Sequence, residues 1–150
     1  MELLPIYFWD GSAAVRRLLR RAGTTESPLM EELMPALSPV ELDATIDRLY
    51  AFRSSMLAIF DQADVVICPV NAGPAVRHGE SLELEDLPPF SYTFSYNMTG
   101  WPGTVVRGGT SPEGLPIGVQ VLAAPSREAR TLAVAKFLES ELGGFQPVEM

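Results

Sequence analysis

The longest regular pattern of apolar and polar positions in this chain begins at Ser38. Ser38-Pro39-Val40-Glu41 is a capping-box signature for the start of a helix, because the Ser38 and Glu41 side chains can each bond the other's backbone N–H. One stripe then recurs at alternating steps of four and three, apolar except for one arginine: Leu42, Ile46, Leu49, Arg53, Met56 and Phe60. The spacing predicts an amphipathic helix from about Pro39 to Gln62 whose stripe faces a core.

Two shorter segments carry helix signals at their ends. Asp10 or Ser12 can cap a first helix that runs to about Ala22, and Gly23 is a stop for it. Another short helix is predicted over residues 90–99, ending at the glycine that follows.

The last helix is predicted from Arg127 to Leu138, with Ser126 as its cap and Gly143-Gly144 beyond its end. Its apolar stripe consists of four residues: Leu132, Ala135, Leu138 and Leu142. Lys136 falls on the opposite side of the helical wheel, so we expect it to face water.

Val65-Val66-Ile67-Cys68 is continuously apolar and is followed by Pro69. This pattern predicts a strand that is buried on both faces and ends at a loop. We expect such a strand to have neighbouring strands, because an unpaired edge would expose backbone donors and acceptors to another chain.

Two more strands are predicted over residues 104–107 and 117–122. Gly108-Gly109 and Pro112-Glu113-Gly114 supply turn chemistry between them, so the two strands should form an antiparallel pair. With three strands and three or four helices, the fold class is α/β.

Composition sets the broad class of the chain. Its 150 residues fit a single domain, 1–150, with no separate second domain. The fractions of hydrophobic residues (47%) and charged residues (20%) are ordinary for a globular protein. The net charge of −8 repels nucleic acid and anionic lipid, so no nucleic acid partner is expected. The one basic cluster, Arg16, Arg17, Arg20 and Arg21, is interpreted as the solvated face of the first helix.

The compartment is predicted from cysteine usage and from the chain's start. Cys68 is the single cysteine, which excludes an intramolecular disulfide and fits a reducing compartment. The first residues do not follow a signal-peptide pattern, and no stretch reaches the roughly 20 apolar residues needed to span a bilayer. We therefore expect a cytoplasmic protein without a membrane span.

A hydrolase needs a nucleophile, a base within reach and donors for the oxyanion. His78, the single histidine, lies in a long loop and could pair with Cys68, but a cysteine in an apolar strand is most simply a small core residue. Ser54-Ser55 lies inside the long helix, where the backbone amides are already bonded. One Cys and one His cannot close a zinc site, so no catalytic residue, metal or cofactor is predicted.

Three segments in succession carry a family resemblance. They are residues 97–103 (Asn-Met-Thr-Gly-Trp-Pro-Gly), residues 114–120 (Gly-Leu-Pro-Ile-Gly-Val-Gln) and the closing helix. Together they resemble the C-terminal part of the amidase signature family of serine amide hydrolases. Asp10-Gly11, before the first helix, and Asp64–Pro69, an apolar strand that ends in proline, are similar to further parts of that family.

The resemblance implies the C-terminal portion of a mixed-sheet fold and cleavage of carboxylic amide bonds by a Ser–Ser–Lys set. No position in residues 1–150 matches that set, so the resemblance gives these residues a supporting role without metal or organic cofactor. Candidates for a substrate-pocket wall are Asn97, Trp101 and the loop 71–90, although Asn97 can equally cap a turn and Trp101 can equally belong to the core.

Two hypotheses follow for the function. In the first, the chain is the C-terminal segment of an amidase that acts on a small-molecule amide when a completing N-terminal part is present, covalently or as another chain. In the second, it is a truncated, non-catalytic module that binds a partner, or a second copy, through an open sheet edge. A small enzyme that uses Cys68 and His78 is a third and weaker alternative.

Overall fold

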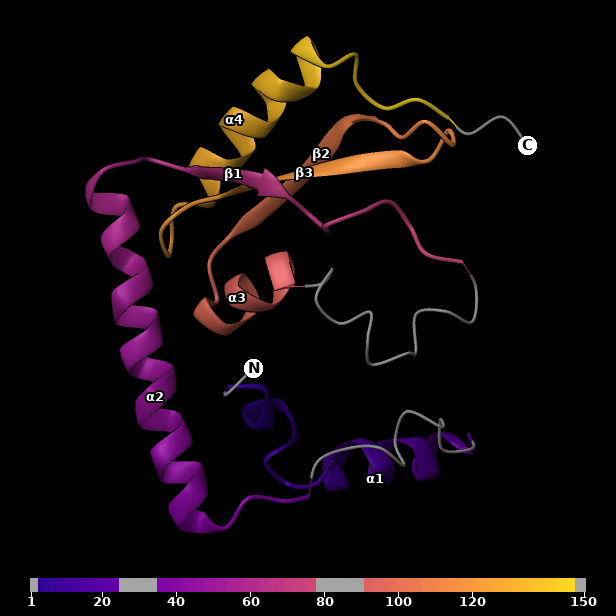
Figure 1. Cartoon of the computed structure of the whole chain (residues 1–150). Helices are drawn as coiled ribbons and strands as arrows, with labels where there is room; N and C mark the ends of the chain where they lie inside the picture. Colours follow the sequence, from indigo (N-terminus) through magenta and orange to yellow (C-terminus); the bar gives the residue numbers. More distant parts are fainter. Residues whose placement is uncertain (1–2, 25–34, 78–90, 148–150) are drawn as a thin grey trace. The chain divides into compact units, whose positions relative to one another are not determined.

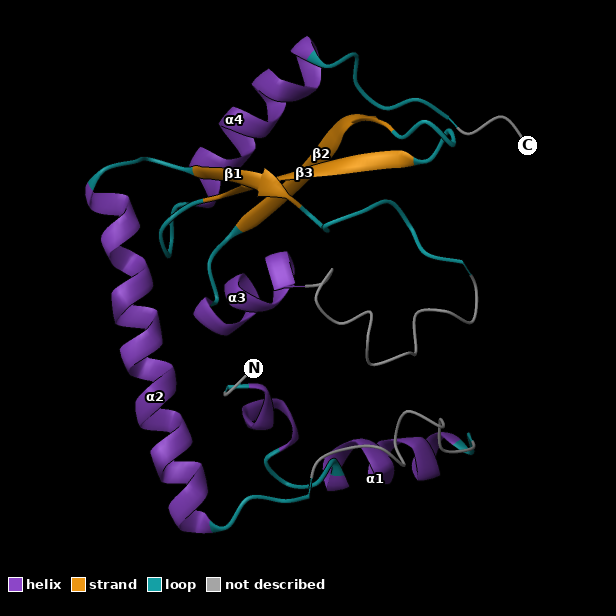
Figure 2. Ribbon diagram, in the orientation of Figure 1, coloured by secondary structure: helices purple, strands orange, loops and turns teal. Residues whose placement is uncertain are grey.

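The computed structural model describes residues 3–24, 35–77 and 91–147. The chain divides into two compact units, Met1–Ser54 and Ser55–Met150, and each is described by itself. The colour gradient in Figure 1 follows the chain through them, and Figure 2 separates helices from strands. Within the described residues the structure has four α-helices and three strands, which confirms the α/β class.

The first unit contains the 3₁₀ helix η1 (Leu4–Phe8), the helix α1 (Ala13–Ala22) and most of α2 (Pro39–Leu57). Asp10 caps α1, because its Oδ2 accepts a bond of 2.8 Å from the N–H of Ala14. Ser12 makes no side-chain capping bond. Gly23 ends the helix at a φ of 67°, a left-handed conformation that glycine adopts without steric cost.

The capping box at the start of α2 is confirmed. The Ser38 N–H donates to Glu41 Oε2 at 2.8 Å, and the Glu41 N–H donates to Ser38 Oγ at 3.3 Å. Interaction with the Ser38 side chain, followed by the hydrogen bond from the Ser38 backbone N–H, lowers the pKa of the Glu41 carboxyl. The α-helix ends at Leu57 and continues as the 3₁₀ helix η3 (Ala58–Asp61), which together cover nearly the predicted length.

The second unit is built on a three-stranded sheet in the order β1 (Val66–Pro69), β3 (Pro116–Leu122), β2 (Gly103–Thr110). Both pairings are antiparallel, which confirms the predicted pair of strands 2 and 3. The described sheet has no parallel pair, so the mixed sheet that the resemblance implies stays a prediction.

The turn between β2 and β3 differs from the prediction at Gly108-Gly109. These glycines lie inside β2, where the register shifts between Arg107 and Gly109, and not in the turn. The turn is made by residues 111–115: the Ser111 N–H bonds the Leu115 carbonyl at 2.8 Å, and the Gly114 N–H bonds the Ser111 carbonyl at 3.0 Å. Glycine tolerates a bulge inside a strand as readily as a turn, and this ambiguity caused the error.

Two helices cover the two faces of the sheet (Figure 2). The helix α4 (Glu128–Glu141) packs on β2 and β3, and the Thr104 hydroxyl of β2 bonds the Thr131 hydroxyl of α4 at 2.9 Å. The helix α3 (Ser91–Thr99), which confirms the predicted short helix, lies over the opposite face, where Cys68 of β1 contacts Tyr96.

The predicted stripe of α4 is partly wrong. Leu132, 59% exposed, and Leu142 face away from the sheet, whereas Thr131 and Ala135 are buried against it. The helix also begins later than predicted, with Arg127 at its N-cap and Ser126 at a φ of 62°, so Ser126 is not the cap. The hydroxyl of Thr131 is accommodated because it bonds Thr104 and the Glu128 carbonyl.

The strand β1 is not buried on both faces, which corrects the prediction made from its continuous apolar run. Ile67 is 50% exposed, although Val121, opposite it on β3, is fully buried. In the described structure β1 is an outer strand, so one of its sides has no neighbour that could cover Ile67.

Candidate functional site

The best-organised polar group in the second unit surrounds Gln120, on the central strand β3. Its side chain is almost fully buried, at 5% exposure. Gln120 Nε2 donates to two backbone carbonyls, that of Pro69 at 2.8 Å and that of Tyr92 at 3.2 Å. A buried amide needs such partners, and here they fasten the end of β1 and the start of α3 to the central strand.

The alternation of the sheet explains why Gln120 reaches these partners. Gln120 pairs with Cys68 of β1 and with Val105 of β2, so the three side chains lie on one face, opposite the face on which Thr104 meets α4. The helix α3 covers this face on the β1 side. Gln120 therefore lies between the sheet and α3, away from α4.

Cys68 and Tyr96 form a second contact on the same face. The Cys68 thiol donates to the Tyr96 hydroxyl at 3.7 Å. Burial, followed by the interaction with the Cys68 sulfur, raises the pKa of Tyr96 to about 12, so its phenol stays protonated at neutral pH. The thiol of Cys68 is thus placed against a neutral hydroxyl that is a poor general base. His78, its predicted alternative partner, lies outside the described residues.

The two predicted pocket-wall residues lie in different surroundings. Trp101 is 7% exposed, and its ring lies 4.6 Å from the Phe60 ring and 5.7 Å from the Tyr96 ring, measured between centroids. Asn97, on α3, is exposed. Trp101 therefore holds η3 against α3, while Asn97 can meet a ligand or another polypeptide. Their role in substrate binding stays a prediction, and the loop 71–90 is described only as far as residue 77.

Three polar side chains near the end of β1 were not predicted individually as site residues: Gln120, Tyr96 and Asn71. Gln120 ends the segment 114–120 that carries the family resemblance, and Asn71 begins the loop 71–90 that was predicted as pocket wall. Asn71 follows β1, and its Oδ1 is buried without a hydrogen-bond partner among the described residues. Gln120 carried a usable signal, since a glutamine alternates with valines in Val119-Gln120-Val121 and so faces away from them. No local sequence pattern identified Tyr96, or Asn71 individually, as part of this polar group.

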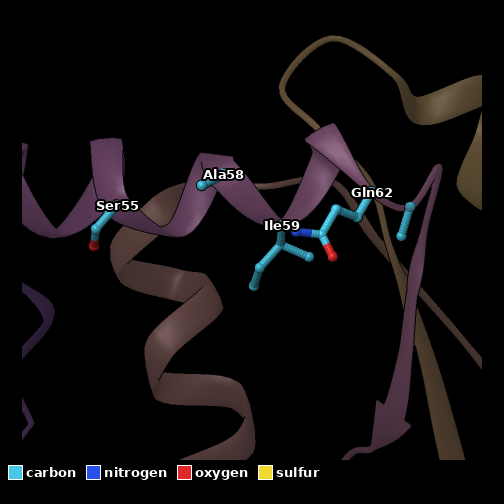
Figure 3. A pocket seen from close by; sticks show the side chains of 5 residues that line it. Ser55, Ala58, Ile59 and Gln62 are labelled. Atoms are coloured by element: carbon cyan, nitrogen blue, oxygen red, sulfur yellow. The ribbon is translucent and has the colours of Figure 1, made fainter.

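A shallow hollow of about 550 Å³ lies along the end of α2 and η3 (Figure 3). Ser55, Ala58, Ile59, Gln62 and Ala63 line it. None of these five side chains is an acid or a base near neutral pH, so the hollow has no proton-transfer group of its own.

The remaining candidates for chemistry are dispersed over the described residues. Lys136 is exposed on α4, as predicted, and Ser54 is exposed on α2. No group of three His, Cys, Asp or Glu side chains in the described part could hold a metal ion. Nor does any helix in that part have the length and apolar character needed to cross a membrane.

Comparison with known proteins identifies the family. The amidase family model matches residues 14–132. The chain belongs to the amidase family. The matched region contains both sheet pairings and the Gln120 contacts described above.

The curated relatives include a glutamyl-tRNA(Gln) amidotransferase subunit from Xanthobacter autotrophicus, 33% identical over 121 residues. That match covers 75% of this chain and 24% of the relative. The protein of the same name from Acidobacterium capsulatum is 38% identical over 90 residues, which cover 56% of this chain and 18% of the relative. The chain thus spans about a quarter or less of the length of these relatives.

Solved structures share the fold. A 6-aminohexanoate cyclic dimer hydrolase in complex with substrate superposes with a TM-score of 0.75 at 20% identity, over 95% of this chain and 35% of that chain. A bacterial aryl acylamidase of the amidase signature family gives a TM-score of 0.61 at 19% identity, over 91% of this chain and 34% of that chain. At these identities the likeness establishes the fold alone.

Proposed function

We propose that the chain supplies the C-terminal part of an amide hydrolase, which cleaves a carboxylic C–N bond in a small-molecule amide. The family match over residues 14–132 carries the proposal. The nucleophile and its base come from polypeptide outside residues 1–150, and the reaction uses no metal or organic cofactor. The expected compartment is the cytoplasm.

These residues act by positioning in this proposal. Gln120 fixes the end of β1 and the start of α3 through its bonds to the Pro69 and Tyr92 carbonyls. A fixed α3 holds Asn97 at one place on the surface, where its amide can bond a substrate or the completing polypeptide. The Trp101 ring contacts the Phe60 and Tyr96 rings and so stabilises the packing of η3 on α3.

A second candidate is favoured by the names of the curated relatives. They are glutamyl-tRNA(Gln) amidotransferase subunits, at 33% and 38% identity. In this alternative the chain is part of one component of an amidotransferase and works within a larger complex. Hydrolysis of glutamine, rather than of simple aryl amides, would then be the partial reaction that the completed protein performs.

The test compares the 150-residue chain with the longest in-frame polypeptide encoded around it. We expect the chain alone neither to react with a serine-directed fluorophosphonate nor to hydrolyse a nitrophenyl amide, and the longer polypeptide to do both. Labelling of the chain alone would contradict the proposal. So would a longer reading frame without a glycine/serine-rich segment and a preceding lysine.

The same samples distinguish the two candidates. Release of ammonia from glutamine without release of nitroaniline favours the amidotransferase component, and the reverse favours the amide hydrolase. Substitution of the serine that the fluorophosphonate labels in the longer polypeptide should abolish both activities, which is the control for contaminating hydrolases.

A further inference from the structure

In the described part of the chain the sheet has two outer strands, β1 and β2, and the hydrogen-bond register shows which backbone groups each one presents outward. The Val70 N–H donates to the Gly118 carbonyl at 3.3 Å, so residues two and four positions before Val70 also bond β3. Ile67 therefore directs its N–H and C=O away from β3. By the same alternation Val105, which lies opposite Gln120, directs its N–H and C=O away from the sheet.

The outer edge of β2 has the features of a protected edge. A bulge shifts the register between Arg107 and Gly109, and the Arg107 side chain bonds the Thr110 hydroxyl. The helix α4 packs against this strand more than against β3. Bulges and charged side chains are devices by which proteins prevent another strand from pairing with an edge.

The outer edge of β1 lacks these devices. Val66, Ile67 and Cys68 are all uncharged, and the strand pairs with β3 without a register shift. Pro69 has no N–H to leave unpaired, and its carbonyl already accepts a bond from Gln120. The side chain of Ile67 is half exposed, on a strand whose apolar run is typical of an inner strand.

We propose that the outer edge of β1 pairs with a strand of the polypeptide that completes the amidase domain, through the backbone N–H and C=O of Ile67. This inference rests on the proposed function. The occupant is chosen because this chain matches the 6-aminohexanoate cyclic dimer hydrolase over 95% of its own length but only 35% of that chain. That chain thus contains polypeptide beyond the matched part, and we assign to such polypeptide the strand that pairs with β1 and covers Ile67.

The experiment uses the tagged 150-residue chain and a defined probe. The probe is the Xanthobacter autotrophicus relative without the 121 residues that match this chain, expressed in the same cells. Two matched variants are compared, Ile67→Pro and Val105→Pro. Each removes one outward N–H from an outer strand at a residue that is about half exposed (50% and 57%), and neither breaks a bond to β3.

We expect the two proteins to co-purify, and Ile67→Pro to weaken the complex about ten- to a hundredfold, since it removes a ladder hydrogen bond and leaves a buried acceptor unpaired. Val105→Pro should change the affinity of the complex by less than about twofold. Amide hydrogen exchange gives a second measurement that needs no variant: the Ile67 N–H should exchange slowly only in the complex, and the Val105 N–H rapidly in both states.

Three results would overturn the inference. They are failure of the wild-type pair to co-purify, equal loss for the two variants, and an Ile67 amide that exchanges equally fast in both states. Self-association of the chain that Ile67→Pro abolishes would assign the edge to a second copy and would likewise refute the stated occupant. Hydrolysis is assayed separately, so a complex without activity contradicts the proposed function while the edge assignment stands.

Discussion

Replacing Gln120 by leucine tests whether this buried amide holds α3 and β1 together. Leucine is close to glutamine in volume and fills the same space between the sheet and α3, so little cavity is created. The change removes both donors, at 2.8 Å from the Pro69 carbonyl and 3.2 Å from the Tyr92 carbonyl. Any loss of stability therefore reports the hydrogen bonds and not packing.

The two bonds set the magnitude. Each is worth about 1 kcal/mol net, and a buried carbonyl left without a donor costs about 1 kcal/mol or more in addition. Gln120→Leu should thus lower the free energy of unfolding by about 2–4 kcal/mol. For a chain of this length that corresponds to a fall in Tm of about 5–15 °C.

Tryptophan fluorescence in urea measures this loss when Trp9 is first replaced by phenylalanine. Trp9 is exposed, whereas Trp101 is buried against Phe60, so the remaining emission reports the unfolding of the second unit. Gln62→Leu is the matched control, because Gln62 is exposed and its loss should change stability by less than about 0.5 kcal/mol. If Gln120→Leu behaves like this control, Gln120 does not tie the two elements together.

Two further predictions concern β2 and Tyr96. Gly108→Ala should destabilise the chain by about 1–3 kcal/mol, because a Cβ there would overlap a methyl carbon of Val119. At Gly109 an added Cβ meets no described atom within 4 Å, so Gly109→Ala should be nearly neutral in the same urea titration. Because the pKa of Tyr96 is raised to about 12 in the folded chain, the stability linked to its protonated form is fully present below about pH 10 and is lost as the pH rises towards 12. The difference in urea midpoint between wild type and Tyr96→Phe should therefore shrink from pH 9 to pH 11, and a constant difference would contradict the assignment.

The helix ends were predictable because their signals are local. At Ser38 and Glu41 the donors and acceptors lie within one turn of each other, and both predicted bonds are present. Gly23 ends α1 for an equally local reason, its left-handed backbone. The cap of α4 failed at Ser126, because a serine near a helix start is a cap only if its backbone takes a suitable conformation, and Ser126 has a φ of 62°.

The contacts that organise the Gln120 region were not predictable, because they join residues distant in the chain. Gln120 reaches a carbonyl 51 residues earlier, and Cys68 meets a tyrosine 28 residues later. Alternation in β3 shows that Gln120 faces away from its valine neighbours, but not what lies on that face. The same limit applies to Thr131, whose burial depends on a partner hydroxyl on another strand.

The error at β1 is informative because its cause is physical. A run of apolar residues such as Val66-Ile67-Cys68 is typical of a strand whose two faces are covered, and an uncovered edge leaves backbone donors and acceptors open to another strand. In the described structure β3 covers one edge, α3 contacts one face at Cys68, and Ile67 is left half exposed on the other. Local pattern thus predicted surroundings that the described residues supply only in part. Of the two outer edges in the described sheet, the half-exposed Ile67 lies on the one that has neither a bulge nor a charged side chain. The neighbouring strand is for that reason assigned to β1 and not to β2.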